Sequence, residues 1–191
     1  MKEHHRIQRQ TSWVIWAQRI LLVWGAFAIR ILTVEAQGLW RDEVDQWRFA
    51  LQPLDALIRN FTRAGWNGPL YSPLLRGWIA LAGDSIFAMR ALSVFWGVLI
   101  LPLLVVLAHR VSGRRRVGRI AGLLVLVSPV FIWYAQEIKM YSWVPMLVLL
   151  ALYALDRACA TADSLWWGVT WVSTTTAFYS HILAALLIPV L

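Results

Sequence analysis

The stretch ALSVFWGVLILPLLVVLA, residues 91–108, decides the fold class because it is almost wholly apolar and carries no charged residue. A helix that crosses the hydrocarbon core of a bilayer needs about 20 mostly apolar residues, with a range of about 17–25. Arg30, near the end of an earlier apolar run, is expected to extend its charged end toward the membrane interface. We expect an all-α fold, a polytopic transmembrane helical bundle formed by a single domain over residues 1–191 and truncated at its C-terminus, with spans at about 13–33, 91–108, 118–134, 141–156, 165–178 and 182–191, the last incomplete.

The composition also indicates a membrane protein. Of the 191 residues, 60% are hydrophobic and 15% are charged, whereas soluble domains carry about 45–50% apolar and about 25% charged residues. The net charge of +8 comes mostly from arginines between the apolar runs, so membrane topology explains it better than nucleic-acid binding. Many of the 13 tryptophans lie near the expected span ends, which is typical of aromatic belts. The single cysteine, Cys159, excludes a disulfide within the chain.

The distribution of basic residues predicts the orientation across the membrane. The N-terminal tail and the segment His109–Arg119 carry an excess of Lys and Arg, which is typical of cytoplasmic loops. Both are therefore expected inside, with an even number of crossings between them. The run Pro69–Ala82 is too short for a further span and is expected to lie as a helix on the outer surface. Residues 34–90 then form one extracytoplasmic loop that carries juxtamembrane helices.

Polar residues gather in three segments on the expected outer side. Asp42 and Glu43 follow the first span, and a carboxylate there can serve as a general base. The sequence SPVFIWYAQEIKMYSW, residues 128–143, carries Glu137, Lys139 and Tyr141, and its Ser-Pro pair permits a kink. His181 follows at another outer helix end. Each segment alone is also typical of an ordinary polar loop, and no ligand spacing supports a metal site.

Short motifs in these segments and between them resemble a known family. They are LWRDE (39–43), NGPLY (67–71), GDS (83–85), MRAL (89–92), SP (128–129), QEIKMY (136–141) and YSH (179–181). Their order and spacing resemble the N-terminal part of the membrane glycosyltransferases of the C-type fold. The closest group is the dolichyl-phosphate-mannose–protein mannosyltransferases (glycosyltransferase family 39-like) and their bacterial relatives, including lipid A aminoarabinose transferases.

The resemblance implies an enzyme that moves a sugar from a polyprenyl-phosphate donor to a protein or glycolipid acceptor at the outer membrane face. It implies a multi-pass protein of the bacterial inner membrane, with its N-terminus in the cytoplasm. The family's base carries over to Asp42, with Glu43 as its supporting neighbour. Lys139 falls where many relatives have an arginine near the donor phosphate, and it lacks that residue's bidentate fork.

Further substrate contacts are expected from four other residues. Arg90 is a second cation candidate, although positioning at the membrane interface explains it equally well, and Tyr141 and His181 can donate hydrogen bonds. Glu137 belongs to the same predicted substrate-binding set. No cofactor is expected, and a divalent metal has no support because Gly68 stands where some relatives place a ligand.

Two other functions remain open on the sequence alone. Several spans with arginines inside them are also found in transporters and lipid flippases, although no internal repeat supports this reading. A noncatalytic membrane scaffold is the third hypothesis. Such a scaffold would tolerate the loss of both Asp42 and Lys139, whereas the transferase would not.

Overall fold

The computed structural model describes residues 20–61 and 68–190, and these form ten helices and no strand. The predicted all-α fold is therefore confirmed. The predicted first span begins at residue 13, so residues 13–19 lie outside the described part, as do the basic tail and Asn67. The elements are a helix over Ile20–Ile31, α2 Arg41–Ala50, α3 Leu54–Phe61, α4 Tyr71–Ala82, α5 Ile86–Ser112, α6 Arg115–Val127, α7 Pro129–Tyr134, α8 Trp143–Thr161, α9 Ser164–Ser180 and the 3-10 helix η1 Ile182–Val190.

Two helices of the described chain, α5 and α8, are long and apolar enough to cross a membrane. Helix α5 extends the apolar run 91–108 at both ends because each end has a capping signal. The Ser85 hydroxyl accepts a hydrogen bond from the Ala88 amide at 3.1 Å, and Gly113 ends the helix in a left-handed conformation with a φ of 68°. Helix α8 packs against α5 on one side and α9 on the other.

Helix α6 approaches α5 closely through two glycines spaced four residues apart. A Cβ atom at Gly118 would lie 2.5 Å from the Val105 carbonyl oxygen, and one at Gly122 would lie 2.5 Å from the Val105 side chain. Small residues at this spacing let two helix backbones approach within a membrane, where van der Waals packing stabilises the contact. The α5–α6 hairpin is therefore fixed by close packing along the C-terminal half of α5.

The predicted span at 118–134 is interrupted at Ser128–Pro129, which separates α6 from α7. Pro129 has no N–H, so it cannot donate to the Val125 carbonyl four residues earlier. The Arg30 guanidinium donates to this carbonyl from Nη2 at 3.2 Å and to the Ala26 carbonyl from Nη1 at 3.1 Å. Arg30 is 0% exposed, so the prediction that its charge extends to the interface is wrong. It is held inside by the carbonyl that the proline leaves without a backbone donor.

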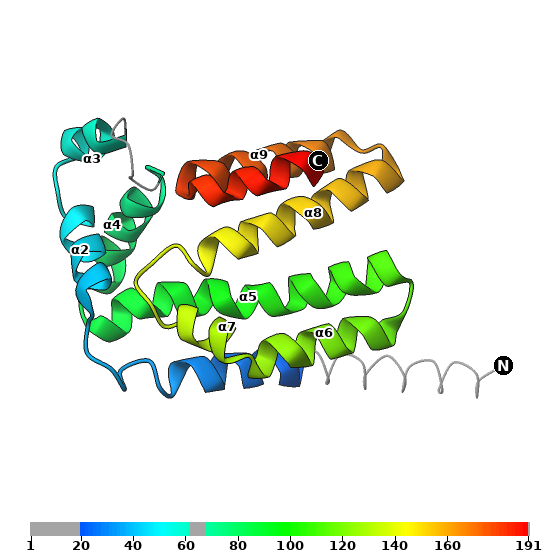
Figure 1. Cartoon of the computed structure of the whole chain (residues 1–191), viewed down its shortest axis with the longest axis horizontal. Coiled ribbons are helices and arrows are strands. Elements are labelled where there is room, and N and C mark those ends of the chain that lie inside the picture. Colours follow the sequence, from blue (N-terminus) through cyan, green and yellow to red (C-terminus); the bar gives the residue numbers. More distant parts are fainter. Residues whose placement is uncertain (1–19, 62–67, 191) are drawn as a thin grey trace.

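The connections between helices gather at the two ends of the bundle (Figure 1). Helices α2, α3 and α4 lie at one end, together with the α7–α8 connection and the turn from α9 into η1. The α5–α6 and α8–α9 connections lie at the opposite end, where an ion pair joins Arg110 to Asp156. Among the described residues, the segments predicted outside therefore share one end, and the two connections predicted inside share the other. Which end faces the cytoplasm stays a prediction.

Candidate active site

A buried ion pair between Glu43 and Arg90 organises the end of the bundle that carries α2. Arg90 Nη2 lies 2.6 Å from Glu43 Oε2, and Arg90 Nε donates to Glu43 Oε1 at 2.9 Å. The side chains are 5% and 0% exposed. A charge buried this deeply costs free energy unless it is paired and hydrogen-bonded, and this paired geometry meets that requirement.

Arg90 also binds the segment that leads from the first helix to α2. Its Nη1 donates to the carbonyls of Val34 at 2.7 Å and Gln37 at 2.8 Å, and its Nη2 donates to that of Gly38 at 3.2 Å. With the two bonds to Glu43, all five N–H groups of the guanidinium have acceptors. This geometry gives Arg90 a positioning role and argues against the predicted contact with a donor phosphate.

Glu43 connects a third part of the chain to this ion pair. Its Oε1 accepts the backbone N–H of Ile138 at 2.9 Å, and its Oε2 accepts that of Trp40 at 3.4 Å. The second bond belongs to the start of α2, where a glutamate at the third helical position satisfies a free backbone N–H. Glu43 was predicted to support a catalytic neighbour, and the structure shows it holding α2, α5 and the α7–α8 connection together.

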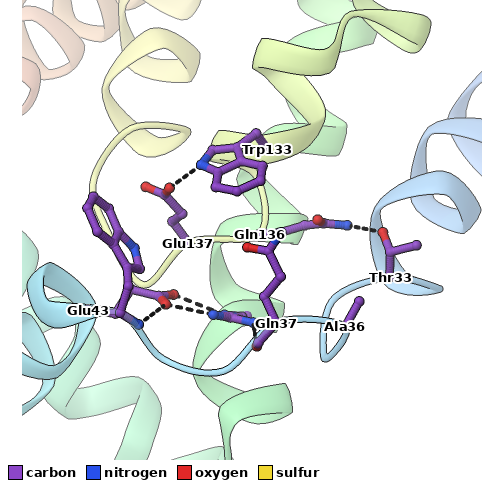
Figure 2. Close-up of a pocket in the computed structure, with 9 residues that line it drawn as sticks. Thr33, Ala36, Gln37, Glu43, Trp133, Gln136 and Glu137 are labelled. Carbon is purple, nitrogen blue, oxygen red and sulfur yellow. Dashed lines mark hydrogen bonds and ion pairs between the residues drawn. The ribbon is translucent and has the colours of Figure 1, made fainter.

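A cavity of about 350 Å³ opens beside this ion pair (Figure 2). Ligand sites in proteins are typically clefts of about 300–1,000 Å³ with a few convergent polar groups. Side chains from the segment between the first helix and α2, from α2, α5 and α7, and from the α7–α8 connection meet here. The lining residues are Thr33, Ala36, Gln37, Trp40, Glu43, Arg90, Trp133, Gln136 and Glu137.

Glu137 is the ionisable residue in this cavity whose hydrogen bonding is incomplete. It is 4% exposed, its Oε1 accepts the indole N–H of Trp133, and its buried Oε2 has no hydrogen-bond partner among the described residues. Burial raises the pKa of the Glu137 carboxyl, and the negative charges of Glu43 and Asp42 raise it further, against the lowering effects of the indole hydrogen bond and Arg90. The Glu137 side chain therefore lines the cavity, while its unpaired Oε2 stays buried (Figure 2).

Lys139 lines a second, smaller cavity of about 110 Å³. Its walls include Asp45 and Gln46 of α2 and Ser72 of α4, and the Gln46 amide donates to the Ser72 hydroxyl at 2.9 Å. Lys139 is half-buried and lies two residues from Glu137. Glu137 and Lys139 therefore line different cavities, although they are neighbours in the sequence.

Asp42 lies on α2 immediately before the buried Glu43, but its carboxylate is half-buried. It makes no hydrogen bond or ion pair with any other residue that the structure describes. It lies close enough to Glu137 and Tyr141 for its charge to act on both. Helical spacing also places it on the face of α2 that carries Asp45 and Gln46. Asp42 and Lys139 thus lie at the same end of the molecule, and Asp45 and Gln46, which share a face of α2 with Asp42, line the smaller cavity with Lys139.

Tyr141 and His181, the remaining predicted substrate contacts, line neither cavity. The Tyr141 ring packs edge-on against Tyr134, with a centroid distance of 4.9 Å. His181 ends α9, and its Nδ1 accepts the Leu183 N–H at 3.1 Å, while burial lowers the pKa of its imidazole. Of the predicted site residues, Glu43, Arg90 and Glu137 line the larger cavity and Lys139 lines the smaller one, whereas Asp42, Tyr141 and His181 line neither.

The sequence did not single out several residues of the larger cavity. Trp133 was assigned to an aromatic belt, but it donates its indole N–H to Glu137. Gln136 Nε2 donates to the Arg30 carbonyl at 2.7 Å and to Thr33 Oγ1 at 2.6 Å, which ties the α7–α8 connection to the first helix. The spacing of four residues between Trp133 and Glu137 could have indicated that their side chains meet. Nothing in the sequence indicated that Gln37 lines the cavity. In the described chain, no three potential ligands cluster as a metal site would require.

Comparison with known proteins supplies one finding. The family model described as "Dolichyl-phosphate-mannose-protein mannosyltransferase" matches residues 67–191, which is more than half of the chain. The match covers Arg90, Glu137 and Lys139 but begins after Asp42 and Glu43. Searches of curated proteins and of solved structures found no match.

Proposed function

The chain belongs to the dolichyl-phosphate-mannose-protein mannosyltransferase family, and from this premise we propose that it transfers a sugar from a polyprenyl-phosphate donor to an acceptor at the extracytoplasmic membrane face. The family is one of membrane glycosyltransferases, and α5 and α8 agree with a membrane setting. The acceptor class, a protein or a glycolipid, is part of the proposal. The proposal also places the protein in the bacterial inner membrane with its N-terminus in the cytoplasm.

One observation carries the proposal: the Asp42 carboxylate has no partner among the residues that the structure describes, and Lys139 lines a cavity with Asp45 and Gln46 of the same helix. The adjacent Glu43 is buried in its pair with Arg90, so it is not free to take a proton from an acceptor. A general base must be accessible and unpaired at the moment of reaction. Asp42 meets this requirement, and we assign it the role of base.

The proposed reaction needs two charged groups of opposite sign. The acceptor oxygen forms a bond to the anomeric carbon while the bond from that carbon to the phosphate oxygen breaks, and the electron pair leaves with the phosphate. The acceptor proton passes to Asp42. Lys139, a point charge with three rotatable donors, stabilises the negative charge that grows on the departing phosphate. Attack opposite the leaving group inverts the configuration at the sugar carbon.

The test is transfer of a labelled sugar from polyprenyl phosphate by the purified protein in detergent. Asp42→Asn keeps the shape of the side chain but removes its basicity, so the rate is expected to fall by about 10²–10⁴. Asp55→Asn is the matched control, because Asp55 is 62% exposed and pairs with Arg59 on α3, away from both cavities. A wild-type rate for Asp42→Asn would remove Asp42 as the base.

A further inference from the structure

Four exposed arginines gather at the α5–α6 connection, at the end of the bundle opposite α2 (Figure 1). Arg114 directly precedes α6, and Arg115, Arg116 and Arg119 lie in its first turns. We call these four residues the arginine cluster. Within the described part of the chain, none of their guanidinium groups has a hydrogen bond or an ion pair. Their donors therefore face outward with no partner in that part of the protein.

The acidic residues that the structure describes at this end are engaged elsewhere. Asp156 forms an ion pair with Arg110, which is not part of the arginine cluster. The Asp163 carboxylate accepts the Leu165 N–H at 2.9 Å at the start of α9. Residues 109–119 contain no acidic residue at all. The arginine cluster is therefore a concentrated positive charge, which attracts anions from outside the chain.

An apolar face of α6 continues from the arginine cluster along the helix. Ile120, Leu123, Leu124 and Val127 are 52–64% exposed, and their spacing from Arg116 places them along one side of α6. The 11 residues from Arg116 to Val127 rise about 16 Å, which is close to half of the hydrocarbon core of about 30 Å. This face, which we call the α6 apolar face, therefore matches the depth of one membrane leaflet.

A phosphate bound at the arginine cluster would not be the one that reacts in the proposed transfer. Helix α5 has 27 residues and is therefore about 40 Å long. Arg90 and its partner Glu43 lie near the first end of this helix, and the arginine cluster follows the last. The proposed base and phosphate cation lie at the Arg90 end. The arginine cluster thus needs a different anionic partner.

We propose that the arginine cluster and the α6 apolar face together bind one anionic phospholipid. The guanidinium groups hold the lipid phosphate, because arginine pairs with phosphate oxygens through two parallel hydrogen bonds. One acyl chain lies along the α6 apolar face. Clusters of about four to eight basic residues beside a membrane helix favour anionic lipids in this way. On the predicted orientation the lipid belongs to the cytoplasmic leaflet, and its binding does not depend on transferase activity.

The first experiment compares two lipids that share their acyl chains. Dioleoylphosphatidylglycerol, which is anionic, and dioleoylphosphatidylcholine, which has no net charge, are titrated against the purified protein in non-ionic detergent. Native mass spectrometry measures the fraction of protein with a bound lipid. The anionic lipid is expected to bind at least about tenfold more tightly, because each basic residue near an anionic lipid contributes about fivefold in affinity. This preference should shrink as the ionic strength rises.

The second experiment locates the binding with charge-matched variants. The site variant removes three positive charges from the arginine cluster through Arg115→Gln, Arg116→Gln and Arg119→Gln. The control variant removes three exposed positive charges from α2 and α3, at the opposite end, through Arg41→Gln, Arg48→Gln and Arg59→Gln. The site variant should bind phosphatidylglycerol at least about tenfold more weakly, and the control variant should bind it as the wild type does. Phosphatidylcholine binding should stay the same in both.

Three results would overturn the proposal. The first is equal binding of the two phospholipids by the wild type, which needs no variant to fold. The second is equal loss of phosphatidylglycerol binding in the site and control variants, or no loss in either. The third is displacement of the lipid by an equal concentration of glycerol 1-phosphate or inorganic phosphate, which would show an anion site that makes no use of the α6 apolar face.

Transfer kinetics separate this lipid from the sugar donor. The site variant should keep the wild-type KM for the polyprenyl-phosphate donor, because the arginine cluster lies at the other end of α5. A raised donor KM in the site variant alone would assign the arginine cluster to the donor and refute the proposal. Phosphatidylglycerol binding that depends on the arginine cluster, in a protein without transfer activity, would contradict the proposed function alone.

Discussion

Replacing Arg90 with alanine tests whether the buried ion pair holds the active end together. The substitution removes five hydrogen bonds, two to Glu43 and three to backbone carbonyls at distances of 2.7–3.2 Å. It leaves Glu43, which is 0% exposed, with only two backbone donors. Breaking a buried pair by removing one partner costs about 3–5 kcal/mol, because the remaining charge stays buried without compensation.

This cost is large enough to measure as a change in thermal stability. For a chain of this size, about 1 kcal/mol lowers the melting temperature by about 2–4 °C, so Arg90→Ala is expected to lower it by about 6–20 °C. The assay is thermal unfolding of the purified protein in detergent. Arg90→Lys keeps the charge but offers at most three donors without the planar fork, so its melting temperature should lie between those of the wild type and Arg90→Ala.

The matched control is Arg41→Ala, on the same end of the molecule. Arg41 pairs with Asp45 at 3.9 Å, and both side chains are well exposed. Exposed pairs contribute about 0.2–1 kcal/mol, so this variant should unfold within a few degrees of the wild type. The reasoning is refuted if Arg90→Ala unfolds at the same temperature as Arg41→Ala. If Arg90 instead bound the donor phosphate, its loss would raise the donor KM and leave the melting temperature nearly unchanged.

Three further predictions concern single contacts, each checked by thermal unfolding in detergent. Gly68→Ala should destabilise by about 1–3 kcal/mol because its Cβ would lie 1.9 Å from a carbonyl oxygen at the end of α9, whereas Gly77→Ala, with open space around its Cβ, should not. Equal effects of these two variants would contradict the packing argument. Burial raises the pKa of Glu137 above 4.5, so the native state keeps a proton that the unfolded chain releases, and stability should fall as pH rises from about 4.5 toward the raised pKa. Glu137→Gln should flatten this slope, and an unchanged slope would exclude Glu137 as its source. Arg30→Ala should cost about 1–3 kcal/mol by leaving a buried carbonyl unpaired, and less in a Pro129→Ala background, where a backbone N–H becomes available. The same cost in both backgrounds would show that the proline is not the reason for the arginine.

The sequence predicted the helices best where the signal was local. The uncharged run at 91–108 required a long helix, and α5 contains all of it. The run at 118–134 was predicted as one span in which the Ser-Pro pair permits a kink, and the structure divides it there into α6 and α7. Arg30 was misplaced for a related reason. Its partner, the Val125 carbonyl, is 95 residues away, and no local pattern shows which carbonyl a proline will leave unpaired.

The site was predictable as a set of segments but not as a set of roles. Asp42 and Glu43 are chemically similar neighbours, and in the sequence only the family resemblance separated them, with Asp42 as the base and Glu43 as its supporting neighbour. The fold separates them, because the Glu43 carboxylate pairs with the Arg90 guanidinium and the Asp42 carboxylate does not. Arg90 itself looked like a free cation because its acceptors lie 47 to 56 residues away.

The hydrogen bonds of Glu43 explain how Asp42, the proposed base, and Lys139, the proposed phosphate cation, keep fixed positions relative to one another. Its carboxylate holds α2 against α5 through Arg90, and this sets the position of Asp42 on the next residue. The same carboxylate accepts the Ile138 N–H, which fixes the peptide between Glu137 and Lys139. With that peptide held, the two side chains line different cavities, Glu137 beside the ion pair and Lys139 beside Ser72 of α4. A single buried carboxylate therefore positions the proposed base, the proposed phosphate cation and a wall of the larger cavity, so the loss of Glu43 should impair transfer even if Glu43 never contacts the substrate.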